Sequence, residues 1–403
     1  MSDLQKAWAK KKAALSEQEV FNELDEEEEE ADYVPELQEG QGQDDDSSSA
    51  SSASSTGTVV PTPSRNLFAR PLGPPRGGGR NLDPIAWTTY FERELFLSSQ
   101  PDDDGKPQIT HHVYLTSPVD KGPLFVMHHG AGSSGLSFAV VGSEIRKKVP
   151  TAGILSLDAR GHGLTVSPSP LDYSLEILRS DLLSVIKQTQ MQMGWKELPP
   201  VILVGHSLGG AVVTDLARTY ALGSSLLGYT VLDVVEGSAM DALQSMTTYL
   251  STRPTGFATI QAGIDWHIRS RTIRYPVSAR TSVPGLLSEV PGSSRPWKWR
   301  TDLAATEPFW ADWFVGLSKK FLAAKGGKML VLAGTDRLDT ELTIGQMQGK
   351  YSLHIFPEAG HFVHEDRPEE TAMVLADFYR RNDRSQLILP PKVSELLAQG
   401  KRV

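Results

Sequence analysis

Six short apolar runs recur between residues 124 and 356, and longer segments of mixed polarity separate them. Most of these runs lack a strict alternation of apolar and polar residues, which is typical of strands buried on both faces of a parallel sheet. The segments between them are long enough for the helical crossovers that parallel strands need. The strands predicted in this way are Leu124–His128, Gly153–Leu157, Val201–Val204, Tyr229–Val234, Met329–Leu332 and Tyr351–Phe356.

The strand pattern is interrupted between Val235 and Lys328, where the sequence has a mostly helical character and many aromatic residues. We interpret about 236–327 as a helical cap inserted before the last strands, with most of its aromatic residues forming the core of the cap. A closing helix is predicted over Pro368–Arg380, which begins with Pro-Glu-Glu. The pattern therefore predicts an α/β protein with a mostly parallel sheet, flanking helices and a helical cap.

Charge divides the chain into regions of different physical character. Residues 1–60 hold 16 acidic and 4 basic residues, a net charge of −12, whereas residues 61–403 hold 33 and 36, a net charge of +3. A stretch rich in Ser, Pro and Gly follows the acidic part, so residues 1–80 are predicted to be disordered. We expect a globular domain over 81–383 and a C-terminal extension over 384–403.

Composition also excludes several classes of function. The 403 residues include no cysteine, which excludes a disulfide framework, a cysteine nucleophile and a thiolate metal site. The near-neutral body gives no electrostatic reason to expect nucleic-acid binding. No apolar run approaches the roughly 20 residues that a membrane helix needs. Because the N-terminus also lacks the apolar region of a secretory signal, a cytoplasmic or nuclear location, or both, is expected.

The sequence Gly-His-Ser-Leu-Gly at 205–209 is the strongest chemical signal. It follows a predicted strand and precedes a run compatible with a helix, which is the setting of a nucleophile elbow. Such an elbow lifts a serine hydroxyl clear of the sheet, and glycines flank it because a Cβ atom would clash in so tight a turn. Ser207 is therefore the predicted nucleophile. The backbone N–H of Leu208 and that of Ala131, in the Gly-rich loop after the 124–128 strand, are the candidate oxyanion donors.

The base and the acid follow from the order serine, acid, histidine that this architecture requires. His361 comes after the last predicted strand and is the candidate base, while His364 is more typical of a residue that anchors the last helix. Two aspartates fit the acid, Asp233 and Asp336, because each follows a strand between Ser207 and His361. The pattern leaves both open, and the general precedent of hydrolases slightly favours Asp336.

The globular part, from about residue 84 to residue 381, resembles protein phosphatase methylesterase. Six strings of the sequence support this resemblance, and each is far more specific than the five-residue elbow motif. They are WTTYF at 87–91, HGAGSSGLSF at 129–138, GHSLGGA at 205–211, DVVEGSAMDAL at 233–243, LAGTDRLDTELTIGQMQGK at 332–350 and GHFVHED at 360–366.

The resemblance implies an α/β-hydrolase that removes the methyl ester from the C-terminal leucine of the protein phosphatase 2A catalytic subunit. It assigns the acid of the triad to Asp233, and the serine and histidine to Ser207 and His361. That phosphatase is then the partner, and no cofactor or metal ion is expected. Two other functions stay open: a general carboxylesterase for small molecules, and a protein that binds the phosphatase with catalysis secondary or lost.

Overall fold

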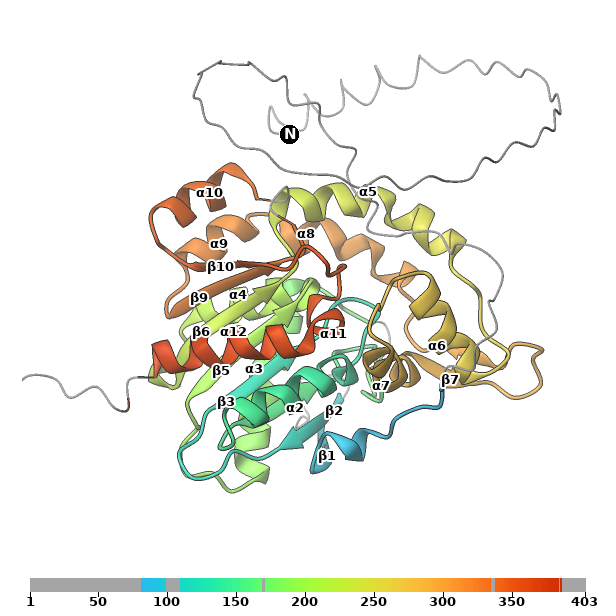
Figure 1. Cartoon of the computed structure of the whole chain (residues 1–403), viewed down its shortest axis with the longest axis horizontal. Helices are drawn as coiled ribbons and strands as arrows, with labels where there is room; N and C mark the ends of the chain where they lie inside the picture. The colour runs from blue at the N-terminus through green and yellow to red at the C-terminus, as the bar shows by residue number, and fades with distance from the viewer. Residues whose placement is uncertain (1–80, 99–108, 169–170, 335–337, 384, 386–403) are drawn as a thin grey trace, which may run out of the picture. The chain divides into compact units, whose positions relative to one another are not determined.

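The computed structural model describes residues 81–98, 109–168, 171–334, 338–383 and 385, which form an eight-stranded sheet with helices on both faces (Figure 1). The predictions for residues 1–80 and for the C-terminal extension lie outside the described residues, apart from Ser385. The strand order is β1-β2-β4-β3-β5-β6-β9-β10. The strands are β1 (Arg93–Ser98), β2 (Thr110–Thr116), β3 (Leu124–His128), β4 (Gly153–Leu157), β5 (Val201–His206), β6 (Leu226–Leu232), β9 (Gly327–Leu332) and β10 (Ser352–Ile355).

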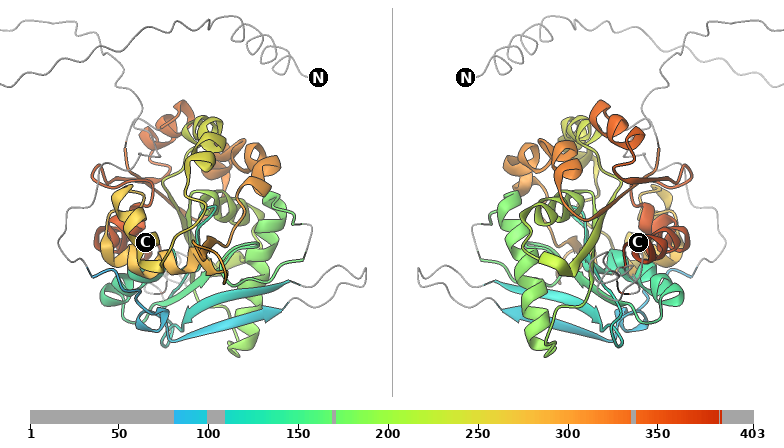
Figure 2. Two further views of the ribbon diagram at one scale, coloured as in Figure 1. Left: turned by 90° about the vertical axis from the view of Figure 1, so that its right-hand side faces the viewer. Right: turned by 90° about the vertical axis from the view of Figure 1, so that its left-hand side faces the viewer.

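The six predicted strands are confirmed as β3, β4, β5, β6, β9 and β10, and all of them pair in parallel. Two strands that the apolar pattern did not indicate, β1 and β2, extend the sheet in antiparallel fashion at one edge (Figure 2). The reason is visible in β2, where the polar residues His111 and His112 are fully buried and hide the apolar signal of a strand.

Helices cover both faces of the sheet, and the side chains of each strand alternate between the two layers. On β3, Leu124 and Val126 face α3 and α4, whereas Phe125 and Met127 face α2 and α12. All four side chains are fully buried, and burying a side chain of this size contributes about 1.5–3 kcal/mol. Helices α2 and α12 lie side by side on their face (Figure 1). The helices are α2 (Ala139–Lys148), α3 (Leu175–Gln192), α4 (Leu208–Thr219) and α12 (Pro368–Asn382).

The chain between β6 and β9 is mostly helical, as predicted, but it also contains a short antiparallel hairpin that the sequence analysis missed. A separate apolar cluster around Ile264 and Leu287 joins this hairpin to two of the helices. The aromatic residues Trp310, Trp313 and Phe314 are buried in the main core. The elements are α5 (Glu236–Thr252), α6 (Ile260–Arg269), α7 (Pro276–Leu286), β7 (Leu287–Glu289), β8 (Trp297–Trp299), α8 (Trp310–Phe314) and α9 (Leu317–Ala323).

Two short helices complete the part that positions the candidate site: α10 (Thr340–Met347) after β9, and α11 (Val363–Asp366) after β10. The predicted closing helix is confirmed as α12, which begins at Pro368 as the sequence indicated. Among the described helices, none combines the length and the apolar character that crossing a bilayer requires.

Candidate active site

Ser207 lies at the turn between β5 and α4, in a backbone conformation that few L-residues adopt. Its φ is 52° and its ψ is −121°. A Cβ atom on Gly205 would lie 2.1 Å from the Gly209 carbonyl oxygen, and one on Gly209 would lie 2.1 Å from the His128 carbonyl oxygen. Since real Cβ atoms do not approach so closely, only glycine fits at either position. The two glycines therefore fix the sharp turn that projects the Ser207 side chain from the end of the sheet.

The loop after β3 packs directly against the elbow. A Cβ atom on Gly130 would lie 3.0 Å from the Cβ atom of Ser207, which brings the neighbouring residue Ala131 to the site. Among the described residues, no protein group accepts a hydrogen bond from the N–H of Ala131 or from that of Leu208. Leu208 is the first residue of α4, so its N–H also lies at the positive end of the helix dipole. Two backbone donors are thus left for a ligand oxygen.

Two buried histidines hold this loop in shape as hydrogen-bond acceptors. The Gly132 N–H donates to His162 Nε2 at 2.8 Å, and the Ala159 N–H donates to His129 Nε2 at 3.0 Å. Both rings must therefore carry their proton on Nδ1, which donates to a backbone carbonyl oxygen in each case. Burial lowers the pKa of both His129 and His162, which keeps the rings neutral.

His361, in the loop after β10, contacts Asp233 at the end of β6. Its Nδ1 lies 2.9 Å from Asp233 Oδ2, so Nδ1–H donates to the carboxylate and Nε2 is left with a free lone pair. The Asp233 side chain is fully buried, whereas that of His361 is 25% exposed. The loop of His361 is tied to the elbow, because His206 Nε2–H donates to the His361 carbonyl oxygen at 2.8 Å. Serine, histidine and aspartate thus come from three parallel strands at the same end of the sheet.

Hydrogen bonds to β9 and to the residue after it hold the turn that carries Asp233. Asp233 has a φ of 52°, its N–H donates to the Val331 carbonyl oxygen, and its Oδ1 accepts from the Ala333 N–H at 2.8 Å. Asp336, the acid that general hydrolase precedent slightly favoured, lies outside the described residues. The contact with His361 is therefore described for Asp233, the residue that the family resemblance implied.

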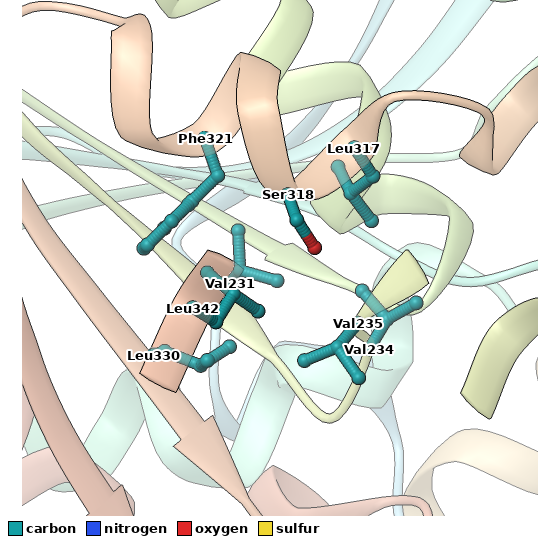
Figure 3. A pocket seen from close by; sticks show the side chains of 8 residues that line it. All are labelled: Val231, Val234, Val235, Leu317, Ser318, Phe321, Leu330 and Leu342. Carbon is teal, nitrogen blue, oxygen red and sulfur yellow. The ribbon is translucent and has the colours of Figure 1, made fainter. Parts of the chain in front are cut away.

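A small apolar pocket lies beside the Asp233 turn (Figure 3). It separates the turn from helices α9 and α10 and is too small and too apolar for a charged ligand. Glu236, at the start of α5, ties this helix to the start of α9 by accepting hydrogen bonds from the N–H groups of Gly316 and Ser318. The pocket is lined by Val231, Val234, Val235, Leu317, Ser318, Phe321, Leu330 and Leu342.

The other histidines near the site have structural partners. Burial lowers the pKa of His206 to about 3, which keeps the elbow neutral next to Ser207. His364 is fully buried, stacks on Phe138 and lies 2.6 Å from Ser137 Oγ through its Nε2. It therefore anchors α11, the short helix that precedes the closing helix α12, whereas the sequence pattern placed this role in the closing helix itself.

One buried residue at the site was missed by the sequence analysis. Asp158, directly after β4, accepts hydrogen bonds from the N–H groups of Gly135 and Leu164 and from His112 Nδ1 at 2.7–2.9 Å. It thereby joins the loop after β3 to the loop after β4. The available signal was its position, because a carboxylate after a buried strand and before Arg-Gly-His-Gly needs several donors to be stable in the interior.

The arrangement combines the parts that acyl transfer needs: a projecting hydroxyl, an imidazole oriented by a carboxylate, and two free N–H donors beside the hydroxyl. Within the described ranges, no group of three or more His, Asp or Glu side chains is placed to hold a metal ion.

Comparisons with known proteins agree with this chemistry. Residues 125–374 match the family described as "Alpha/beta hydrolase family". Protein phosphatase methylesterase 1 of Gibberella zeae is 66% identical over 408 residues, and that of Neurospora crassa is 62% identical over 462 residues; both alignments cover all of both chains. The protein of the same name from Schizosaccharomyces pombe is 47% identical over 308 residues, which cover 76% of this chain and 87% of the relative.

Solved structures show the same fold at much lower sequence identity. The structure of E-2-(acetamidomethylene)succinate hydrolase is 21% identical, with a TM-score of 0.55, and covers 71% of this chain and 100% of its own. A thioesterase domain from the curacin biosynthetic pathway is 18% identical, with a TM-score of 0.51 over 70% of this chain and 98% of its own. The sheet, the site and the relatives that span the whole sequence lead to one conclusion: the chain belongs to the protein phosphatase methylesterase family of the α/β-hydrolases and is a carboxylic ester hydrolase.

Proposed function

We propose that this enzyme hydrolyses the methyl ester on the C-terminal leucine of the protein phosphatase 2A catalytic subunit, with Ser207 as nucleophile, His361 as general base and Asp233 as its orienting acid. The observation that carries the mechanism is the 2.9 Å hydrogen bond between His361 Nδ1 and Asp233 Oδ2, next to the elbow of Ser207. The choice of a phosphatase as substrate is supported by the names of relatives that span the whole chain.

In the first half of the reaction, Ser207 Oγ attacks the ester carbonyl carbon and His361 Nε2 takes the hydroxyl proton. The N–H groups of Leu208 and Ala131 donate to the oxyanion that forms. The bond to the methoxy oxygen then breaks, and His361 returns the proton to this oxygen, so methanol leaves. The product is an ester between Ser207 and the leucine carboxyl group.

In the second half, water attacks this acyl-enzyme while His361 takes one of its protons. The tetrahedral intermediate collapses, Ser207 recovers its proton from His361, and the free carboxyl group leaves. Asp233 does not change its protonation state. It keeps the proton of His361 on Nδ1 and stabilises the imidazolium that forms twice in each cycle.

The test is the demethylation of carboxymethylated phosphatase 2A catalytic subunit by the purified full chain. A Ser207→Ala protein and a simple aryl ester are the controls. We expect the methyl group to be lost only with Ser207 present, and at a higher kcat/KM than that of the aryl ester.

Three other outcomes contradict parts of the proposal. Fast cleavage of the aryl ester with an unchanged phosphatase indicates a general carboxylesterase. Stable binding of the phosphatase without loss of the methyl group, by the parent protein and by Ser207→Ala alike, indicates a binding protein. Equal demethylation by both proteins excludes Ser207 as the nucleophile.

A further inference from the structure

Helix α11 follows His361 directly and carries a buried carboxyl group that no step of the proposed mechanism uses. Glu365 is 1% exposed. Among the described residues, no Lys, Arg or His forms an ion pair with it, whereas its neighbour Asp366 faces Arg274. A buried carboxylate without a cation is costly, so the protonation state of Glu365 needs an explanation.

The carboxyl group of Glu365 joins three elements around the site. Ser137, in the short 3-10 helix η2 (Gly135–Phe138), contacts Oε1 through its Oγ at 2.7 Å. Ser282 of helix α7 contacts Oε2 through its Oγ at 2.5 Å. The backbone is tied in as well, because Ser278 Oγ–H donates to the Glu365 carbonyl oxygen at 2.7 Å. Glu365 thus links α11 to η2, which follows the loop of Ala131, and to helix α7 of the cap.

Counting protons along these contacts assigns a charge to Glu365. Ser137 Oγ also lies 2.6 Å from His364 Nε2, and Ser282 Oγ lies 3.0 Å from the Ser278 carbonyl oxygen. If His364 Nε2–H donates to Ser137, then Ser137 donates to Oε1 of Glu365. If Ser282 donates to Ser278, then Oε2 must itself carry a proton and donate to Ser282. Every contact holds one proton only when Glu365 is a neutral carboxylic acid.

The surroundings favour the same neutral form. Burial raises the pKa of Glu365 to about 8, and the nearby charge of Asp366 acts in the same direction against the two serine hydroxyls. Helix α7 and η2 present only serine hydroxyls to this carboxyl group. The titratable groups nearby are His364, whose pKa burial lowers well below its ordinary value, and His206, whose pKa burial also lowers and whose ring lies tilted 4.6 Å from that of His364. Neither ring supplies a positive charge at neutral pH.

The position of α11 also sets the position of the His361 loop, residues 356–362. The Gly360 N–H donates to Asp366 Oδ2 at 2.7 Å, and the Glu365 N–H donates to the Phe362 carbonyl oxygen at 2.9 Å. A shift of α11 would therefore move His361 relative to Asp233 and Ser207, and a misplacement of about 1 Å in such a site is enough to reduce turnover strongly.

We propose that Glu365 is a positioning residue, which in its protonated form holds α11 against η2 and α7, and that its ionisation at alkaline pH loosens this contact and lowers turnover. The proposal rests on the proposed function, because it acts through His361 as the base. When Glu365 ionises, the Ser282 hydroxyl must donate its hydrogen bond to the carboxylate and no longer to the Ser278 carbonyl oxygen. An unpaired negative charge is then left between three elements.

The test uses Glu365→Gln, because a glutamine amide donates to Ser282, accepts from Ser137 and cannot ionise. For the parent protein we expect kcat to fall about tenfold between pH 7 and pH 9.5. Glu365→Gln is expected to match the parent at pH 7 and to keep its kcat up to pH 9.5. Glu365→Ala is expected to be slow at every pH. Glu369→Gln, which changes an exposed carboxylate four residues away, is the matched control and should keep the alkaline fall.

A second arm measures stability and does not depend on the reaction. The pKa of Glu365 is about 8 in the folded protein against an ordinary value of 4.5, so the folded state holds the proton more tightly than the unfolded state. The stability from this group is therefore fully present below about pH 4.5 and is lost as the pH rises towards 8. The difference in Tm between Glu365→Gln and the parent should shift in favour of the variant over this range.

Each result has a defined consequence. A Tm difference that stays constant from pH 5 to pH 9 overturns the neutral carboxyl group. The expected stability shift together with the same alkaline fall of kcat in Glu365→Gln overturns the positioning role. A parent protein that does not hydrolyse the methyl ester contradicts the proposed function and leaves the stability arm unaffected.

Discussion

Helices α4 and α5 follow neighbouring strands of the sheet, begin next to Ser207 and Asp233 respectively, and are packed in opposite ways. In α4, all ten residues from Leu208 to Ala217 are buried. In the 17 residues of α5, the buried residue is Ala239. The sheet and α4 thus hold the turn of the partly buried Ser207 against the core, whereas the helix after the aspartate is largely at the surface. Rigid placement of the reacting groups and an open cap surface are both useful for an enzyme whose proposed substrate is another protein.

The first way to sharpen this contrast is to remove the chemistry without disturbing the core. Ser207→Ala is expected to lower kcat by about 10⁶-fold, because the nucleophile is lost and only binding and the oxyanion donors remain. The thermal midpoint should change little, since the two flanking glycines and the Ser207 backbone bonds are kept. Residual turnover within tenfold of the parent, measured on the methyl ester, would contradict the role of Ser207.

The second-largest loss of turnover is expected from a change of Asp233, which precedes the more exposed helix α5. Asp233→Asn is expected to lower kcat by about 10⁴-fold, because the amide no longer holds the proton of His361 on Nδ1. Its Oδ1 can still accept from the Ala333 N–H, so folding should be kept. Asp241→Asn, an exposed change within α5, is the matched control and should leave kcat unchanged. A loss of less than tenfold in Asp233→Asn would shift the acid to another residue, and Asp336 would be tested first.

A smaller but direct comparison of the two helices uses one glycine from each. Gly209→Ala in α4 places a methyl group 2.1 Å from a backbone oxygen that cannot move aside. We expect the free energy of unfolding to fall by about 3 kcal/mol or more, with loss of activity. Urea denaturation followed by circular dichroism measures the change. Unchanged stability would contradict the close contact between position 209 and the His128 carbonyl oxygen.

The smallest effect is expected in the other helix. A methyl group on Gly237 of α5 meets no atom within 4 Å. Gly237→Ala should therefore raise the free energy of unfolding, by at most about 1 kcal/mol, because alanine favours the helix more than glycine does. The same urea titration provides the measurement, and kcat on a small methyl ester should stay the same. A clear destabilisation would show that α5 is packed more tightly than its exposed side chains indicate.

The sequence predicted the parallel part of the sheet well, because its strands are apolar on both faces. The runs at 124–128 and 153–157 coincide with β3 and β4, residue for residue. The antiparallel edge was missed for a physical reason: β1 is largely exposed, and β2 buries His112, whose hydrogen-bond partners are Asp158 after β4 and Glu94 on β1. Periodicity within a strand cannot indicate such partners.

The residues of the candidate site also differ in whether adjacent sequence is enough to predict them. The elbow is a local motif, so Ser207 and its strand and helix could be predicted from adjacent residues alone. The acid depends on which strand end lies beside His361, and the sequence pattern therefore left Asp233 and Asp336 open. The burial of Glu365 depends on η2 and α7, which lie far away along the chain. From the sequence alone, a charged residue in a helical segment is predicted to be exposed, because its buried partners are not known.

The left-handed backbone of Ser207 and Asp233 has a consequence for how such a protein evolves. Both residues have a φ of 52°, and a non-glycine residue in such a conformation carries strain of about 1–3 kcal/mol. Selection for turnover therefore maintains two side chains at positions where glycine would adopt the same backbone conformation without strain. A descendant released from that selection would relieve this backbone strain by losing its chemistry, so positions 207 and 233 are where a relative that has become a pure binding protein should first drift towards glycine.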